Sequence, residues 1–146
     1  MSEGEPHKPV RIAAIGDLHV HDKPNGALRP VFTRVSQHAD VLVLCGDLTT
    51  LGRPAEAEIL AAELSVCTIP IVAVLGNHDF ESGHAEEVQK ILRGAKVNFL
   101  GEETHIIGGV GFAGVKGFGG GFNRYMLTSF GEPAIKNFVH EALNES

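Results

Sequence analysis

The stretch VLVLCGD, residues 41–47, decides the fold because it joins an apolar strand to a polar turn. Its first four residues form a continuous apolar run, which is typical of a parallel strand that is buried on both faces. Gly46 and Asp47 end this run. Ligands of open parallel sheets bind beyond the carboxyl ends of the strands, so we expect Asp47 to lie where chemistry can take place.

The sequence on both sides of this stretch alternates between strand and helix patterns. Pro54 suits the first turn of a helix, and Gly94 is expected to cap the end of another. The predicted strands are residues 10–15, 41–44 and 69–75, and the predicted helices are residues 27–37, 54–64 and 85–93. Repeated strand–helix–strand units predict an α/β fold with a parallel sheet and right-handed crossovers.

The pattern changes after residue 95. Short strands are predicted at residues 96–100, 104–107 and 110–115, and the glycine-dense stretch GVKGFGGGF, residues 114–122, must be a loop. Pro133 opens a last helix, whose predicted inner face is Ile135, Phe138, Val139 and Ala142. We therefore divide the chain into a polar tail at residues 1–9 and a single domain at residues 10–146.

Three predicted strands end in side chains that can bind hard metal ions. The first ends in Asp17 and His19, the second in Asp47, and the third in Asn77, His78 and Asp79. Unpaired carboxylates that lie close together are costly unless a cation compensates their charge. Carboxylate, imidazole and amide groups suit divalent ions such as Mn, Fe or Zn, so the sequence predicts a metal site at this edge.

The spacing within each motif predicts how these side chains point. In an extended segment Asp17 and His19 lie on the same side, so both can reach one ion. Asp47, from the neighbouring strand, could lie between two ions, and Asn77 offers a neutral carbonyl oxygen. His78 would then lie on the opposite side of an extended chain and face a substrate. His21 is interpreted as a solvent-facing loop residue.

The ordered set D-x-H, GD and GNHD, which spans residues 12–79, resembles the signature of the calcineurin-like metallophosphoesterase superfamily. The stretch GFAGVKGFGGGF, residues 111–122, resembles a loop of bacterial and archaeal members. The resemblance implies a four-layer α/β/β/α sandwich. It also implies a dinuclear metal centre that hydrolyses phosphomonoesters or phosphodiesters, with a bridging hydroxide as nucleophile.

The resemblance also implies a role for each matching residue. Asp17 and His19 would bind the first of two divalent ions, Asp47 would bridge both ions, and Asn77 would bind the second. His78 would contact the phosphate and either act as the acid toward the leaving group or stabilise the transition state. Asp79 would orient and charge-stabilise His78.

The chain departs from the family pattern because it contains no Gly-His-x-His motif. The later histidines, His84, His105 and His140, are interpreted as surface or structural residues. We therefore expect a sandwich that is truncated at its carboxyl end, weak or no activity of this chain alone, and possible self-association through the incomplete sheet. The alternative function is a non-catalytic metal-binding or interaction fragment with an incomplete site.

The charge and residue composition of the chain limit the kinds of partner and the location that we expect for it. The formal net charge is −6 and the sequence shows no Lys/Arg cluster, which argues against nucleic-acid binding. No apolar run approaches the ~20 residues that a membrane helix needs. The two cysteines predict no disulfide framework, which fits a cytoplasmic protein. A small phosphorylated substrate is the expected partner.

Overall fold

A computed structural model describes residues 8–24, 26–101, 103–116, 124, 128 and 130–145. Most of the predicted polar tail, at residues 1–7, and most of the predicted glycine-rich loop, at residues 117–122, lie outside the described residues.

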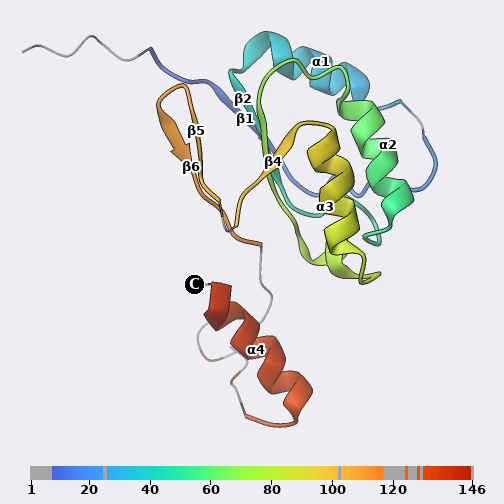
Figure 1. Cartoon of the computed structure of the whole chain (residues 1–146), viewed down its shortest axis with the longest axis vertical. Helices are drawn as coiled ribbons and strands as arrows, with labels where there is room; N and C mark the ends of the chain where they lie inside the picture. The colour runs from blue at the N-terminus through green and yellow to red at the C-terminus, as the bar shows by residue number, and fades with distance from the viewer. Residues whose placement is uncertain are drawn as a thin grey trace, which may run out of the picture.

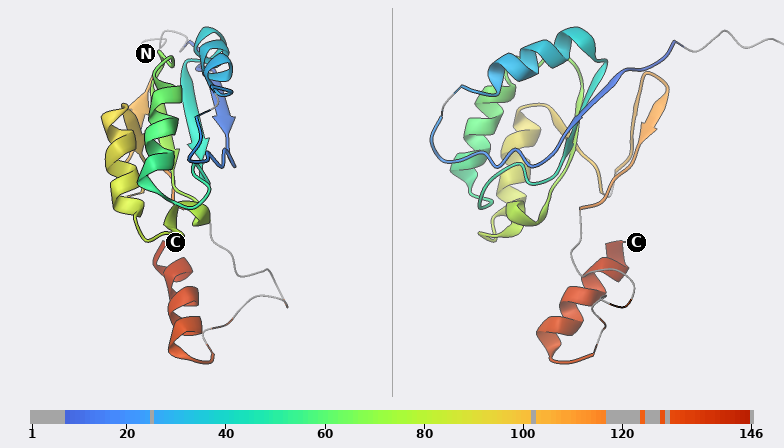
Figure 2. Two further views of the ribbon diagram at one scale, coloured as in Figure 1. Left: turned by 90° about the vertical axis from the view of Figure 1, so that its right-hand side faces the viewer. Right: turned by 180° about the vertical axis from the view of Figure 1, so that it is seen from behind.

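A parallel sheet of four strands forms the centre of the described chain (Figure 1). Its strands, in spatial order, are β1 (Ile12–Ile15), β2 (Val41–Cys45), β3 (Ile71–Val74) and β4 (Val97–Phe99). The connecting helices are α1 (Arg29–His38), α2 (Pro54–Leu64) and α3 (Ala85–Gly94). The spatial order follows the chain order, so right-handed crossovers place all three helices on one face (Figure 2). The predicted α/β fold with a parallel sheet is confirmed.

The two faces of the sheet carry separate apolar clusters. On β2, Leu42 and Leu44 point toward the helices and pack in one cluster with the fully buried Phe32 of α1. Val41, the alternate residue on β2, belongs to the cluster on the opposite face together with Val72 of β3. This alternation is the two-residue period of a strand, and it explains why β2 reads as a continuous apolar run.

A hairpin of β5 (His105–Ile107) and β6 (Val110–Phe112) covers part of the face opposite the helices (Figure 2). Phe112 is 9% exposed and packs against Val41 and Val72. Ile12 on β1 is 52% exposed, so the edge of this face near β1 stays open to solvent. The described layers are therefore helices, parallel sheet and hairpin.

The helix α4 (Pro133–Glu145) lies outside these layers in Figure 1. An ion pair between Lys116 and Glu141 links it to the end of the segment that follows β6. Ile135 and Phe138 are each 43% exposed, so the predicted inner face of this helix is not buried. The helical period of the apolar residues predicted the helix but did not identify a surface for it to pack against.

Two helix ends depart from what their own sequence suggests. The prediction that Gly94 caps α3 is wrong, because the N–H groups of Ala95 and Lys96 still bond to carbonyls of the last turn and Lys96 takes the left-handed conformation (φ 66°). At the start of α1, the carboxylate of Glu63 from α2 accepts hydrogen bonds from the N–H groups of Leu28 and Arg29. A buried carboxylate from another helix therefore replaces the missing local N-cap.

Candidate metal centre

The segments that leave β1 and β2 continue side by side beyond the sheet. Asp17 N–H donates to the Gly46 carbonyl at 3.1 Å, and His19 N–H donates to the Asp47 carbonyl at 3.0 Å. A parallel bridge then joins Val20 to Thr49. These backbone bonds hold the polar residues of both strand ends at one edge of the sheet.

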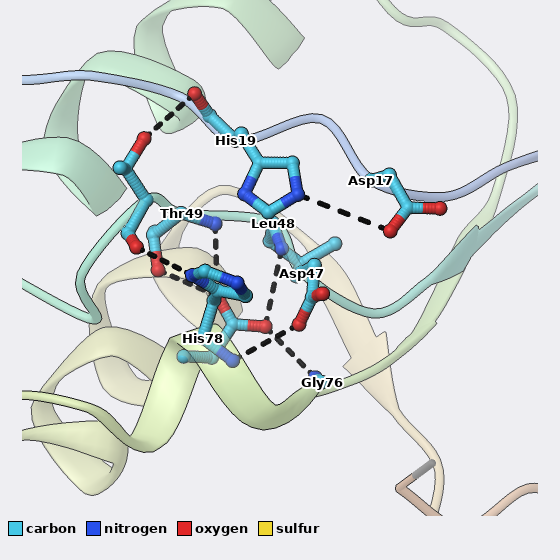
Figure 3. A network of polar contacts seen from close by, with 9 residues as sticks. Asp17, His19, Asp47, Leu48, Thr49, Gly76 and His78 are labelled. Atoms are coloured by element: carbon cyan, nitrogen blue, oxygen red, sulfur yellow. Dashed lines mark hydrogen bonds and ion pairs between the residues drawn. The ribbon is translucent and has the colours of Figure 1, made fainter. Parts of the chain in front are cut away.

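His19, Asp47 and His78 form a cluster that could hold a metal ion (Figure 3). One ligand atom from each residue lies within 4.8 Å of the other two. The imidazole rings of His19 and His78 meet edge to face with centroids 4.6 Å apart. Asp17 adjoins the cluster, because its carboxylate lies 3.9 Å from His19 Nε2. Residues that are far apart in the sequence thus converge from the ends of β1, β2 and β3.

The backbone of this cluster is in a conformation that L-residues rarely adopt. Asp17, His19 and Asp47 have φ values of 54°, 43° and 49°. Left-handed geometry costs about 1–2 kcal/mol per non-glycine residue, and such residues concentrate at functional sites. The prediction that Asp17 and His19 occupy an extended segment is wrong, yet the turn still brings both side chains together.

The ends of β2 and β3 approach each other so closely that both need glycine. A Cβ atom on Gly76 would collide with the carboxylate and the backbone nitrogen of Asp47. A Cβ atom on Gly46, which has a φ of 90°, would lie 3.0 Å from the Cα of Gly76. The glycines of CGD and GNHD therefore allow Asp47 and His78 to meet.

His78 lies in a short 3₁₀ helix, η1 (Asn77–Phe80), and not in an extended chain. The extended conformation predicted at His78 is therefore wrong, and its ring lies in the cluster with His19 and Asp47. Its backbone N–H donates to Asp47 Oδ1 at 3.0 Å. Its Nδ1 lies 2.9 Å from the carbonyl oxygen of Thr50. This hydrogen bond, followed by the negative charge of Asp47, raises the pKa of His78 above its ordinary value, while desolvation opposes the rise.

Asp79 is fully buried and has a different main task from the one predicted. Its Oδ1 accepts from the N–H and the hydroxyl of Thr49, and its Oδ2 accepts from the N–H groups of Leu48 and Gly76. The Thr50 carbonyl, rather than Asp79, bonds to the His78 ring. Asp79 still contributes negative charge near His78, but its hydrogen bonds tie the segment after β2 to the end of β3.

Asn77 is the first residue of η1, and its side chain is exposed at the same edge of the sheet.

Sequence reasoning missed two residues that support this edge. Thr50 bonds to His78 and to the segment that carries His19. Glu56, which is 2% exposed, accepts hydrogen bonds from the N–H groups of Leu51 and Arg53. The signal was the Thr-Thr pair that follows Gly46-Asp47-Leu48, together with a glutamate three residues after Arg53, as in a capping box.

The donor set fits a divalent transition-metal ion. Imidazole nitrogen and carboxylate oxygen bind such ions at about 2.0–2.2 Å, so two ligands of one ion lie up to about 4.4 Å apart. The 4.8 Å limit of the cluster exceeds this value by an amount that a small side-chain rotation removes. A cavity of about 290 Å³, lined in part by His19, His21 and Lys23, opens beside the cluster. It offers space for part of a substrate.

Comparisons with known proteins agree with this geometry. A family described as calcineurin-like phosphoesterase matches residues 10–142. A protein of Synechococcus sp., named a probable cyclic nucleotide phosphodiesterase, is 34% identical over an alignment of 110 residues, and the match covers 68% of this chain and 41% of that protein. An uncharacterised protein of Methanocaldococcus jannaschii is 33% identical over 137 residues, which are 94% of this chain and 55% of that protein. The chain thus spans about half the length of these relatives.

Among the described residues, no helix combines the length and the apolar character that crossing a membrane requires.

Proposed function

The chain belongs to the calcineurin-like phosphoesterase family, and from this premise we propose that it hydrolyses phosphate esters with the help of divalent metal ions. The observation that carries the proposal is the convergence of His19, Asp47 and His78 at the carboxyl edge of the sheet. A phosphate ester is an anion, and the chain itself is acidic, so a bound cation supplies the local positive charge that substrate binding needs.

The proposed centre extends beyond these three side chains. Asp17 lies beside His19, and Asn77 begins η1 next to His78, so both can complete the coordination of two ions. Asp47 comes from the strand between these two ends and would help to hold both ions. Divalent ions such as Mn, Fe or Zn would polarise the phosphoryl oxygens and activate a water for attack on phosphorus.

His78 would act on the proton of the leaving group. Because Nδ1 bonds to the Thr50 carbonyl, Nε2 is the nitrogen that can hold a proton toward the cluster. Asp79 would act indirectly, by fixing the segment that carries Thr50.

The substrate class is part of the proposal. The name of the Synechococcus relative favours phosphodiesters over phosphomonoesters. We propose a small phosphodiester that places its phosphate on the ions and one of its organic groups in the cavity beside His19. A cytoplasmic location and self-association through the sheet remain predictions from the sequence.

The test uses metal-stripped protein to which Mn²⁺ is added back. Hydrolysis of bis-p-nitrophenyl phosphate and p-nitrophenyl phosphate compares diester with monoester, and calorimetry measures Mn²⁺ binding. Asp47→Asn should weaken binding and hydrolysis at least ~100-fold, because even residues that only orient metal ligands are worth about 10–100-fold. The matched control is Asp40→Asn, which alters an aspartate next to the other end of the same strand and should change neither quantity.

Two results would contradict the proposal. Hydrolysis that survives Asp47→Asn would show that the reaction takes place elsewhere. Mn²⁺ binding by the unmodified chain without turnover of either ester would favour the alternative, a non-catalytic metal-binding or interaction module.

A further inference from the structure

Thr50 lies where the segments that carry three histidines meet. Its carbonyl oxygen is 2.9 Å from His78 Nδ1. Its hydroxyl oxygen is 2.8 Å from the carbonyl oxygen of His19 and 3.2 Å from Nδ1 of His21. Its N–H donates to the carbonyl of Val20 at 3.1 Å. Every polar group of Thr50 therefore contacts the segment after β1 or the histidine of η1.

The first of these contacts fixes the tautomer of His78. A backbone carbonyl can only accept a hydrogen bond, so the proton must lie on His78 Nδ1. In the neutral ring Nε2 then has a free lone pair. The same contact also fixes the ring plane, as the outer partners of metal-binding histidines do.

The second set of contacts fixes the tautomer of His21. The Thr50 hydroxyl has a single hydrogen, and the His19 carbonyl at 2.8 Å can only accept it. The hydroxyl oxygen then has only lone pairs to offer His21, so His21 Nδ1 must be the donor. His21 consequently also has an unprotonated Nε2, and it lines the cavity beside His19.

We propose that Thr50 is a positioning residue for the metal centre, holding His78 through its carbonyl and the His19–His21 segment through its hydroxyl. The proposal rests on the proposed function in so far as it concerns the metal. It concerns a residue outside the cluster, because Thr50 contacts the His78 ring through its carbonyl and the segment that carries His19 through its hydroxyl.

The surroundings of Thr50 make it rigid enough for this task. The preceding residue, Thr49, is fully buried, donates to Asp79 and accepts from the N–H of Gly52. The following residue, Leu51, donates its N–H to the buried carboxylate of Glu56. A residue held on both sides can transmit its position to the rings that it contacts, whereas a mobile loop could not.

The first test reads the tautomers directly in metal-free protein, by nitrogen NMR of labelled histidines well above their ordinary pKa. His78→Gln and His21→Gln assign the two rings. We expect both rings as the Nδ1–H tautomer in the unmodified protein. If either ring proved to be the Nε2–H tautomer in the unmodified protein, that result would overturn the proposal, and no Thr50 variant would be needed.

The second test removes the hydroxyl. Thr50→Val keeps the branched shape, so the His21 tautomer should move toward Nε2–H and the Mn²⁺ affinity should fall about 10-fold or more. Thr50→Ser should restore both, because it keeps the hydroxyl. The matched control is Thr33→Val on α1, which also removes a hydroxyl bond to a backbone carbonyl and should change neither readout.

An unchanged His21 tautomer and an unchanged Mn²⁺ affinity in Thr50→Val would overturn the proposal. Failure of the proposed function looks different, since the unmodified protein would then bind Mn²⁺ without hydrolysing either ester. The tautomers and the affinity still test Thr50 in that case.

Discussion

The two edges of the parallel sheet use aspartate in opposite ways. At the amino edge, Asp40 meets the guanidinium of Arg11 on the surface, with 34% and 60% of their side chains exposed. At the carboxyl edge, Asp79 is fully buried and accepts four hydrogen bonds, three of them from backbone N–H groups. When a surface ion pair is broken, water takes the place of the lost partner. Buried N–H groups that lose their acceptor find no such replacement. The same residue type is therefore dispensable at one edge and structural at the other.

The largest effect should come from Asp79→Asn, which keeps the shape of the side chain. Each carboxylate oxygen accepts from two donors, so in either orientation the new NH₂ group faces two of them. Two unsatisfied buried donors at ~1–3 kcal/mol each predict a loss of about 2–6 kcal/mol in the free energy of unfolding. Urea denaturation measures it.

The control for this comparison is Asp40→Asn, measured near neutral pH, which should give a much smaller loss. If the two variants lost similar stability, burial would not be what distinguishes the two edges, and the comparison would fail.

An intermediate effect should come from Glu56→Ala at the start of α2. Glu56 is 2% exposed, and its carboxylate accepts from the N–H groups of Leu51 and Arg53, so removing it leaves two donors of a helix start without their partner. Caps of this kind are worth about 0.5–2 kcal/mol, and we expect a loss of about 1–2 kcal/mol by the same measurement.

Glu58→Ala is the matched control for Glu56→Ala, because Glu58 lies on the same helix and is exposed. Its loss should be near zero. A comparable loss in both variants would mean that negative charge near the start of the helix, not the hydrogen bonds of Glu56, sets the stability of this region.

The fold was predictable because its signals are carried by residue type. The bounds of α2 were predicted correctly from Pro54 and the apolar stripe that follows it, and each sheet strand was found to within two residues. The strand ends could be located in the same way, since a parallel sheet brings its carboxyl ends to one edge. Asp17, His19, Asp47 and His78 were therefore named before their geometry was known.

The orientation of the site residues could not be predicted in this way. The 3₁₀ helix η1 contains only four residues, which is too short to leave a hydrophobic period, so the sequence predicted an extended chain at His78 where the structure has a helical turn. Thr50 was missed because it acts on His78 through a backbone carbonyl, which every residue has. Asp79 was assigned to its sequence neighbour His78, whereas its partners are mostly backbone groups about thirty residues earlier.

The smallest effect is a pH dependence at the amino edge. The hydrogen bonds and charge of Arg11 lower the pKa of Asp40 from 3.8 to about 2. Because the folded pKa is the lower one, the pair stabilises the fold above pH 3.8, and this contribution is lost as the pH falls toward about 2. The thermal midpoints of the unmodified protein and Asp40→Asn should therefore differ slightly above this window and converge below it. In an Arg11→Gln background the difference between the two midpoints should no longer depend on pH, because Asp40→Asn then has no ion pair to remove. A difference that stays constant through the window would show that the ion pair contributes nothing, and backbone hydrogen bonds such as that from the Asp40 N–H to the Arg11 carbonyl would then hold the amino edge.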